Sequence, residues 1–268
     1  MPLLDRLTRN YRHLCKVRGS AEMAAFGRHQ KLGDVEAGEM PLSLATFDST
    51  MKSTQILIPL VFEFVAESLE RFHELEPPEK WKIVSNFYPT FALLDHTFRS
   101  LKYFKHGGNL MLATFTTYFD LNDLDGFFQG MERGDVETAK RLVKDQAVHA
   151  QKCNDVMRRN PIDEEELAAV IGMEMANGDT GLSLLSDDIA RVLQEQWKRL
   201  LRELGSFYRR RKPADVSHSA IRIGRLFDLI VELKSHMPVL QEDFECWRLL
   251  DVVDEDGLVF QLRKLECS

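Results

Sequence analysis

The spacing of apolar and polar positions predicts long amphipathic helices over most of this chain. The clearest case runs from residue 62 to residue 104, where apolar residues recur at steps of three and four on both sides of Pro77 and Pro78. That spacing places the apolar residues on one face of a helix. Adjacent prolines end one helix and preset the first turn of the next. The stretch therefore predicts two long helices joined by a short turn.

Weaker versions of the same pattern predict helices elsewhere in the chain. They cover residues 3–14, 135–157, 163–176, 187–208 and 217–246. Segment 19–51 is rich in Gly, Ala, Ser and Thr and has little periodicity, so it predicts a long connection with a short helix near 21–26. The next helix is expected to begin at the N-cap residues 48–50. Residues 177–179 and 209–213 are expected to be loops.

A single stretch favours β-structure. Residues 110–118 follow a Gly-Gly-Asn break, are rich in Leu, Thr and Phe, and predict a small hairpin. There is no internal repeat and no low-complexity linker, so residues 1–268 are expected to form one domain.

Composition narrows the class of protein further. The 268 residues are 44% hydrophobic and 29% charged, with a formal net charge of −7, which is ordinary for a globular protein. Nothing in this balance gives the basic footprint of a nucleic-acid-binding domain. No apolar run approaches the ~20 residues of a membrane helix, and the charged amino terminus is unlike a secretory signal. An intracellular protein is expected.

Metal chemistry has little support in the sequence. The four cysteines form no C-x-x-C pair. Glu70 and His73 match one half of a di-iron motif, which needs a second Glu-x-x-His that the chain lacks. His149 and Cys153 lie four apart on a predicted helix and could share an ion, but no further ligand pair completes the set. A core cysteine and a surface histidine explain that spacing better.

Catalytic motifs are also missing from the sequence. There is no nucleophile elbow and no phosphate-binding glycine loop. A basic stretch, Lys198 to Lys212, could aid nuclear import or contact phosphate. A solvated helix end whose cations suit the helix dipole is the simpler interpretation. We therefore expect no cofactor and no enzyme activity; an all-α metalloenzyme is the rival class.

A set of residues between Phe72 and Asp95, taken with its spacing, resembles the signature of a known family. It consists of Phe72-x-x-Leu75, Glu79-Lys80, Ile83-Val84, Phe91 and Asp95, with Pro77-Pro78 before the first acid. The set resembles the signature of nuclear receptor ligand-binding domains, in the divergent style expanded in nematodes. Later segments, up to residues 223–262, resemble the later helices of that family in order. The resemblance covers nearly the whole chain.

The resemblance implies an all-α fold, a three-layer antiparallel helical sandwich of about a dozen helices with a small β-hairpin. It also implies a lipophilic ligand, such as a fatty acid or a sterol-like molecule, in an apolar cavity. The candidate lining residues are Phe62, Val65, Ala66, Leu94, Phe98 and Phe115. Each of them is explained equally well as packed core.

The family's mechanism implies a coregulator groove completed by the final helix. The candidate groove residues are Glu67, Ser85, Leu258, Val259, Gln261 and Leu262. Here the sequence departs from the family. Glu67 and Ser85 align with positions that usually carry lysine, and Gln261 with a usual glutamate. In the family, the lysines and the glutamate form a clamp, in which opposite charges cap the two ends of the coregulator helix. Glu67, Ser85 and Gln261 cannot form that clamp in the usual way.

The same resemblance implies a homodimer or heterodimer through Leu226, Phe227 and Ile230, although burial within the monomer would give the same pattern. It implies a nuclear location. DNA would be bound only through a zinc-finger module that this sequence does not contain. The alternative to a ligand sensor is a constitutive, ligand-independent domain for coregulator binding and dimerisation.

Overall fold

The computed structural model describes residues 1–27, 41–104, 108–131, 134–176, 187–211, 216–239, 242 and 246. Its helices are α1 (Leu3–Ala25), α3 (Phe47–Ser68), α4 (Pro77–Tyr103), α5 (Leu124–Phe127), α6 (Val136–Arg159), α7 (Glu164–Met175), α8 (Asp187–Arg211) and α9 (Val216–Lys234), with a 3₁₀ turn η1 (Phe72–Glu74). The strands are β1 (Ser43–Leu44), β2 (Leu110–Leu112) and β3 (Thr117–Asp120).

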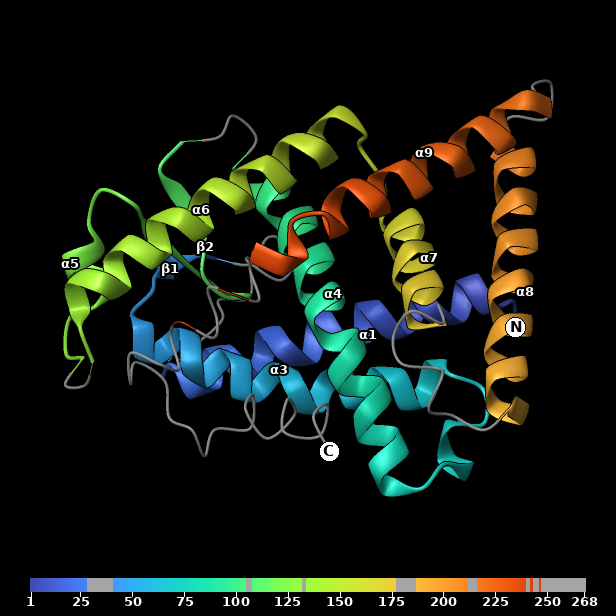
Figure 1. Ribbon diagram of the computed structural model, residues 1–268, viewed down its shortest axis with the longest axis horizontal. Helices are drawn as coiled ribbons and strands as arrows, with labels where there is room; N and C mark the ends of the chain where they lie inside the picture. Colours follow the sequence, from blue (N-terminus) through green and yellow to red (C-terminus); the bar gives the residue numbers. More distant parts are fainter. Residues whose placement is uncertain are drawn as a thin grey trace.

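The long helices are arranged in tiers (Figure 1). The α1–α3 pair lies on one side and the α6–α9 pair on the other, and α4 and α7 lie between them. The packing agrees, because α1 packs on α3 and α7, and α4 packs on α3, α6, α7 and α9. Helix α8 closes one end against α1, α7 and α9.

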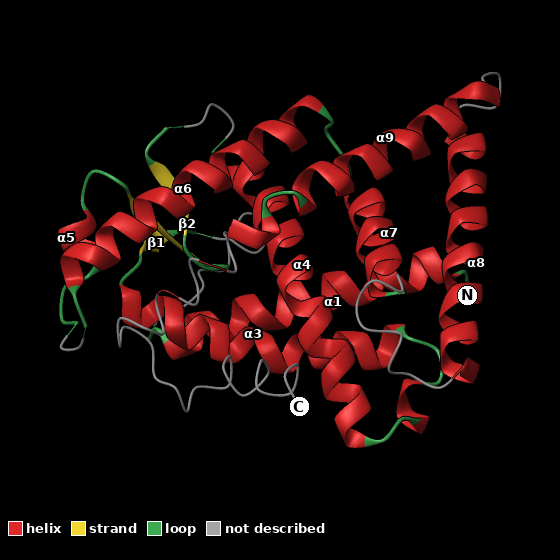
Figure 2. Cartoon of the chain, viewed as in Figure 1, coloured by secondary structure: helices red, strands yellow, loops and turns green. Residues whose placement is uncertain are grey.

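The expectation of a mostly helical protein with a small β-element is confirmed (Figure 2). The expected count of about a dozen helices is not confirmed, because the described ranges contain eight α-helices. Among the described residues, no helix is long and apolar enough to cross a membrane.

One large cluster of buried apolar side chains extends from α1 to α9. Its centre is aromatic: the rings of Phe64, Phe87 and Phe91 lie 5.8–6.5 Å apart between α3 and α4. A smaller cluster at the sheet end of the molecule gathers around Phe127 and Phe128 of α5. Burial of such aromatic side chains contributes much of the stability of a helical core.

Helix α1 is longer than the sequence predicts. The short helix expected near residues 21–26 is present, but the expected break at residue 19 is wrong, because α1 continues through Gly19 to Ala25. Arg18 pairs with Asp95 of α4, and Glu22 accepts from the Ser53 hydroxyl of α3, so both buried side chains hold this extension in place. A charge at Glu22 interrupts the apolar pattern, which is why periodicity alone ends the helix too early.

The junction between α3 and α4 also differs from the expected short turn. Helix α3 begins one residue after Thr46, which caps it, and ends at Ser68. The chain then turns at Arg71, whose φ of 63° is in the left-handed region. Pro77 and Pro78 do begin α4, as predicted, behind a capping box at Glu76.

The predicted hairpin is confirmed, and β2 pairs antiparallel with β3. The sequence does not predict β1, whose two residues pair parallel with Thr117 and Tyr118. Nor does it predict the single-turn helix α5. The expected loop at residues 209–211 is wrong, because α8 continues through Arg211. Helix α9 ends at Lys234, before the expected end at residue 246, but after a turn at residues 235–236 the described residues 237–239, 242 and 246 are again helical. The predicted last helix, including Leu258, lies outside the described residues.

Candidate ligand-binding and coregulator sites

Charged side chains form a buried network between α1 and α4. The guanidinium of Arg18 donates from Nε to Glu22 Oε1 and from Nη1 to Asp95 Oδ2, both at 3.0 Å. The hydroxyl of Tyr11 donates to Asp95 Oδ1 at 2.8 Å. All four side chains are buried. Charges withdrawn from water are tolerated when they are paired and hydrogen-bonded, and here each one is.

The same network holds the turn of the β-hairpin. Glu22 accepts hydrogen bonds from the Thr116 amide at 2.9 Å, the Phe115 amide at 3.2 Å and the Thr114 hydroxyl at 2.8 Å. It also accepts from the hydroxyl of Ser53 on α3. One carboxylate on α1 therefore joins α3 and a turn that lies more than 90 residues away in sequence.

Arg99 holds the turn from its other side. Its guanidinium carbon lies 3.6 Å from the centroid of the Phe115 ring, and Nη2 donates to the Phe115 carbonyl. Arg18 lies 5.4 Å from the same ring. Cation–π contacts of this kind strengthen when water is excluded. The buried aromatic ring thus lies close to two guanidinium groups.

These surroundings set the protonation of nearby groups. Burial alone would raise the pKa of Glu22, but Arg18 and the hydroxyl donors outweigh it and hold the pKa below its usual value. Burial raises the pKa of Cys15 to about 12, so the thiol stays neutral and a poor nucleophile. Burial, with a smaller contribution from Arg99, lowers the pKa of His96 to about 4. In this interior the Glu22 carboxylate therefore stays charged beside Arg18, whereas Cys15 and His96 stay neutral.

The predicted pocket residues do not all face one place. Val65 and Leu94 lie in the main core, and Phe98 packs against it. Phe115 lies in the buried turn. Phe62 is half-buried, and its ring centroid lies 4.8 Å from that of Trp81 and 5.5 Å from that of Phe72.

Ala66, one turn after Phe62 on α3, is exposed. An exposed side chain does not suit the lining of an enclosed cavity. Ala66 is therefore a surface residue, Phe62 and Phe98 are half-buried against the core, and Val65, Leu94 and Phe115 are buried.

Comparison with known proteins gives the family. The family model described as the ligand-binding domain of nuclear hormone receptor matches residues 38–250. This chain belongs to that family. The match takes in α3 through α9, so it includes the helices and the hairpin described above.

Full-length relatives agree with this assignment. The chain is 22% identical over 267 residues to nuclear hormone receptor family member nhr-28 of Caenorhabditis elegans, covering 98% of this chain and 58% of that protein. It is 24% identical over 259 residues to family member nhr-86 of the same organism, covering 94% of this chain and 60% of that protein. The chain thus spans less than two thirds of the length of these curated relatives.

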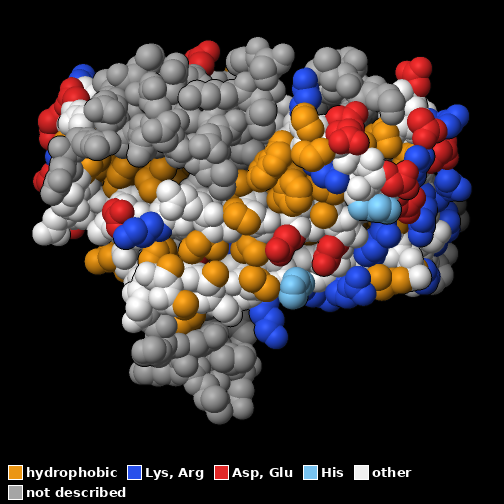
Figure 3. Space-filling view, turned by 90° about the horizontal axis from the view of Figure 1, so that it is seen from below, with side chains coloured by type: hydrophobic (Ala, Val, Ile, Leu, Met, Phe, Trp, Pro, Cys, Tyr) orange, Lys and Arg blue, Asp and Glu red, His pale blue; other side chains and the backbone are white. Residues whose placement is uncertain are grey.

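In this receptor domain, the two predicted clamp positions differ in exposure. Glu67 on α3 is exposed, whereas Ser85 on α4 is buried and its hydroxyl donates to the Lys82 carbonyl at 3.0 Å. Figure 3 shows one face of the molecule, with apolar side chains gathered near its middle and acidic ones beside them. The groove residues Leu258, Val259, Gln261 and Leu262 lie outside the described residues.

The predicted dimer residues of the receptor domain lie on α9. Leu226 and Ile230 are buried in the main core, and Phe227 packs against it with its ring 6.1 Å from that of Trp197. Burial within the monomer thus explains the apolar pattern at Leu226 and Ile230. The exposed apolar side chains of α9 are instead Ile221 and Val231.

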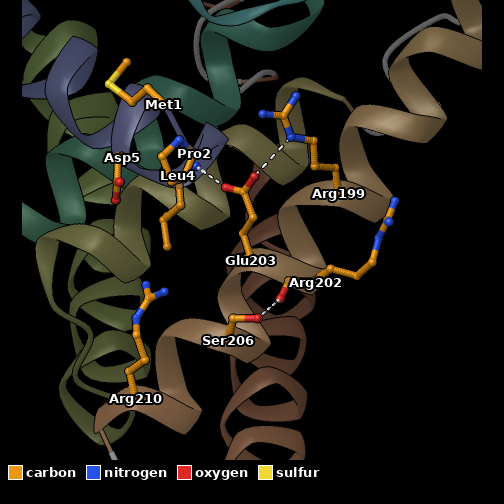
Figure 4. A pocket seen from close by; sticks show the side chains of 9 residues that line it. All are labelled: Met1, Pro2, Leu4, Asp5, Arg199, Arg202, Glu203, Ser206 and Arg210. Atoms are coloured by element: carbon orange, nitrogen blue, oxygen red, sulfur yellow. Dashed lines mark hydrogen bonds and ion pairs between the residues drawn. The ribbon is translucent and has the colours of Figure 1, made fainter.

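A surface groove of about 580 Å³ lies where the start of α1 meets α8 (Figure 4). Pro2 and Leu4 form one wall, and Arg199, Glu203 and Arg210 contribute to the other. Glu203 accepts from the Leu4 amide at 2.9 Å and from Arg199 Nε at 3.0 Å. A carboxylate thus already occupies the N-terminus of α1, where the helix dipole favours an anion.

The basic stretch noticed in the sequence begins in the middle of α8 at Lys198, and Arg209 to Arg211 form the last turn of that helix, in keeping with the solvated helix end that we expected. Lys212 lies outside the described residues. Arg211 pairs with Asp163 at the start of α7, and Arg209 donates to the hydroxyl of Ser206. Such cations complement the C-terminal dipole of the helix.

The metal candidates are not brought together. Cys153 is fully buried in the core, away from the surface that a metal site with His149 would need. Within the described residues, no group of three or more metal-ligating side chains occurs.

Sequence reasoning missed Arg18, Glu22 and Arg99. The signal in the sequence is a charged residue on an otherwise apolar helix face. Over a short stretch of sequence, such a residue looks the same as the end of a helix.

Proposed function

We propose that this chain is the sensor module of a nuclear receptor transcription factor, which binds a lipophilic molecule and recruits coregulators in the nucleus. The observation that carries this proposal is the family match over residues 38–250. The fold supports it, because the interior is mostly apolar and the hairpin turn is held against α1 by hydrogen bonds to Glu22. Apolar interiors of this kind suit ligands with few polar groups.

For the ligand, we propose a fatty acid or sterol-like molecule that contacts Val65, Leu94, Phe98 and Phe115. Val65 of α3 and Leu94 of α4 lie in the main core, Phe98 of α4 packs against it, and Phe115 is buried in the hairpin turn. Native mass spectrometry of the protein purified from cells under mild conditions tests the idea. A retained lipid mass that is lost on organic extraction is the expected result. A bare polypeptide that also fails to take up added fatty acid or sterol would contradict it.

For the coregulator, we propose that Phe62 and Trp81 form the apolar floor of the groove and that Ala66 and Glu67 form its edge. The two aromatic rings are in contact and are only half-buried. An acid at Glu67 repels the negative C-terminal end of a helix and attracts its N-terminal end. The preferred partner helix would therefore lie in the opposite direction, or carry basic residues near Glu67.

Peptide binding by fluorescence anisotropy tests this groove. We expect weak binding of an ordinary leucine-rich coactivator peptide, and a gain of about fivefold or more when Glu67→Lys restores the usual charge. Trp81→Ala should remove binding, while Glu63→Lys on the same exposed side of α3 serves as the charge control. Tight capture of that peptide by the unmodified domain, unaffected by Leu262→Asp, would sink the idea.

The constitutive alternative remains distinguishable by the same two assays. It predicts peptide binding that does not change when lipid is extracted or added. A ligand sensor predicts a change in peptide affinity, because a ligand shifts the balance between two conformations only as far as it binds them unequally.

A further inference from the structure

Two histidines that the receptor function does not use lie side by side. His149 is on α6, and His236 follows the end of α9. Their Nδ1 atoms are 3.5 Å apart, and their ring centroids are 5.6 Å apart. The turn after α9 is held by hydrogen bonds from the Ser235 amide to Val231 and from the His236 amide to Leu233, both at 3.1 Å. These bonds hold the backbone that carries the second imidazole.

The spacing of these nitrogens fits a metal ion. Zinc binds histidine nitrogen at about 2.0–2.1 Å with tetrahedral geometry, which places two ligand nitrogens about 3.3 Å apart. The observed separation of 3.5 Å is close to that spacing. Both residues are partly exposed, so an ion can reach them and water can fill the remaining coordination positions.

We propose that His149 and His236 form a zinc site that clips α6 to the end of α9. The site has two protein ligands, and water supplies the others. Its ligands belong to segments that are 87 residues apart, so a bound ion joins them across the α6–α9 packing. A neutral histidine pair that shares one proton gives the same distance, and the experiment must separate the two.

Zinc titration by calorimetry on protein freed of metal by a chelator is the direct test. We expect one saturable site per chain, weakened about tenfold or more by His149→Asn and by His236→Asn. His73→Asn is the matched control, because that side chain is 85% exposed and has no histidine beside it. Circular dichroism of each variant checks that the fold is retained.

A second variant moves the affinity in the opposite direction. Lys152 is exposed on α6 and acts electrostatically on His236. Lys152→Gln removes a nearby positive charge and should tighten zinc binding. Zinc should also raise the melting temperature of the unmodified domain but not of either histidine variant, since a ligand that binds only the folded state stabilises it.

Three results would overturn the proposal. The first is the absence of saturable zinc binding at submillimolar concentration. The second is binding that both asparagine variants leave unchanged. The third is binding that His73→Asn abolishes, which would place the ion elsewhere.

Discussion

At the scale of single residues, the carboxylate of Glu22 illustrates how a helical core keeps a charge. Its relative exposure is 0%, yet both oxygens have several donors from α1, α3 and the hairpin turn. Arg18 and Asp95 extend the chain of contacts, and Arg99 adds a second cation beside Phe115. Two acids and two bases leave the cluster without net charge, which limits the cost of burying it.

Replacing Glu22 should therefore destabilise the fold strongly. Glu22→Gln keeps the shape but leaves Arg18 with Asp95 as its only acidic partner, and removal of one member of a buried pair costs about 3–5 kcal/mol. Urea unfolding measures the loss. Glu63→Gln, at an exposed position of α3, should change the stability by less than about 0.5 kcal/mol. A similar small effect at Glu22 would show that the network contributes little.

A second prediction concerns pH. Burial lowers the pKa of His96 to about 4 from an ordinary 6.5, so between these values the unfolded chain binds a proton that the folded chain does not. Stability should fall by on the order of 3 kcal/mol as the pH drops through this window. Glu22 and Glu166 add a further loss below about pH 4.5, because the fold lowers the pKa of both.

Urea unfolding of His96→Gln across pH 4 to 7 tests the assignment. The variant should lose most of the slope between pH 6.5 and 4, while His73→Gln should keep it. An unchanged slope in His96→Gln would assign the pH dependence to other groups.

At the scale of elements, the sequence predicts most helices because their apolar faces repeat regularly. It fails where tertiary contacts override the local pattern. Helix α1 continues past residue 19 because Glu22 finds partners in the hairpin, which no local window contains. Strand β1 exists only through its pairing with β3. The sequence pattern likewise does not show that Phe62 is only half-buried, between the buried Phe72 and the half-buried Trp81.

Close packing at α7 gives an element-scale prediction. A methyl group at Gly172 would meet Leu7 Cδ1 far inside contact distance and Leu200 Cδ2 at 3.0 Å. Gly172→Ala should thus cost about 1–3 kcal/mol through overpacking, despite the better helix propensity of alanine.

Gly205→Ala in α8 is the matched control for Gly172→Ala. Its new methyl group meets only the flexible end of Arg209, at 3.8 Å. The control should be neutral or stabilising by up to about 1 kcal/mol. Thermal unfolding of both variants decides; equal stabilisation would show that α1 and α8 can move away from α7.

At the scale of the whole molecule, α9 faces two ways. Leu226 and Ile230 pack into the core, whereas Ile221 is 55% and Val231 70% exposed. If the receptor domain dimerises through α9, the exposed pair must make the contact. Isolated apolar residues are common on surfaces, so only a measurement of assembly can assign them.

Analytical ultracentrifugation of Ile221→Asp with Val231→Asp makes that measurement. The dissociation constant of the dimer should rise by about tenfold or more if these residues lie at the interface. Val148→Asp on α6 is the control, because that valine is also exposed. An unchanged dimer, or a monomer at every concentration of the unmodified protein, would exclude α9 as the interface.

The position of Glu22 has a practical consequence for where this domain starts. The family match begins at residue 38, beyond the whole of α1. A shorter protein that starts there would lose Tyr11, Arg18 and Glu22 together. Asp95 would keep its charge without these partners, and the amides of the hairpin turn would lose their acceptor. Family boundaries drawn from sequence similarity would therefore cut through a unit that folds as one, and an expression trial begun at residue 38 should yield aggregated protein.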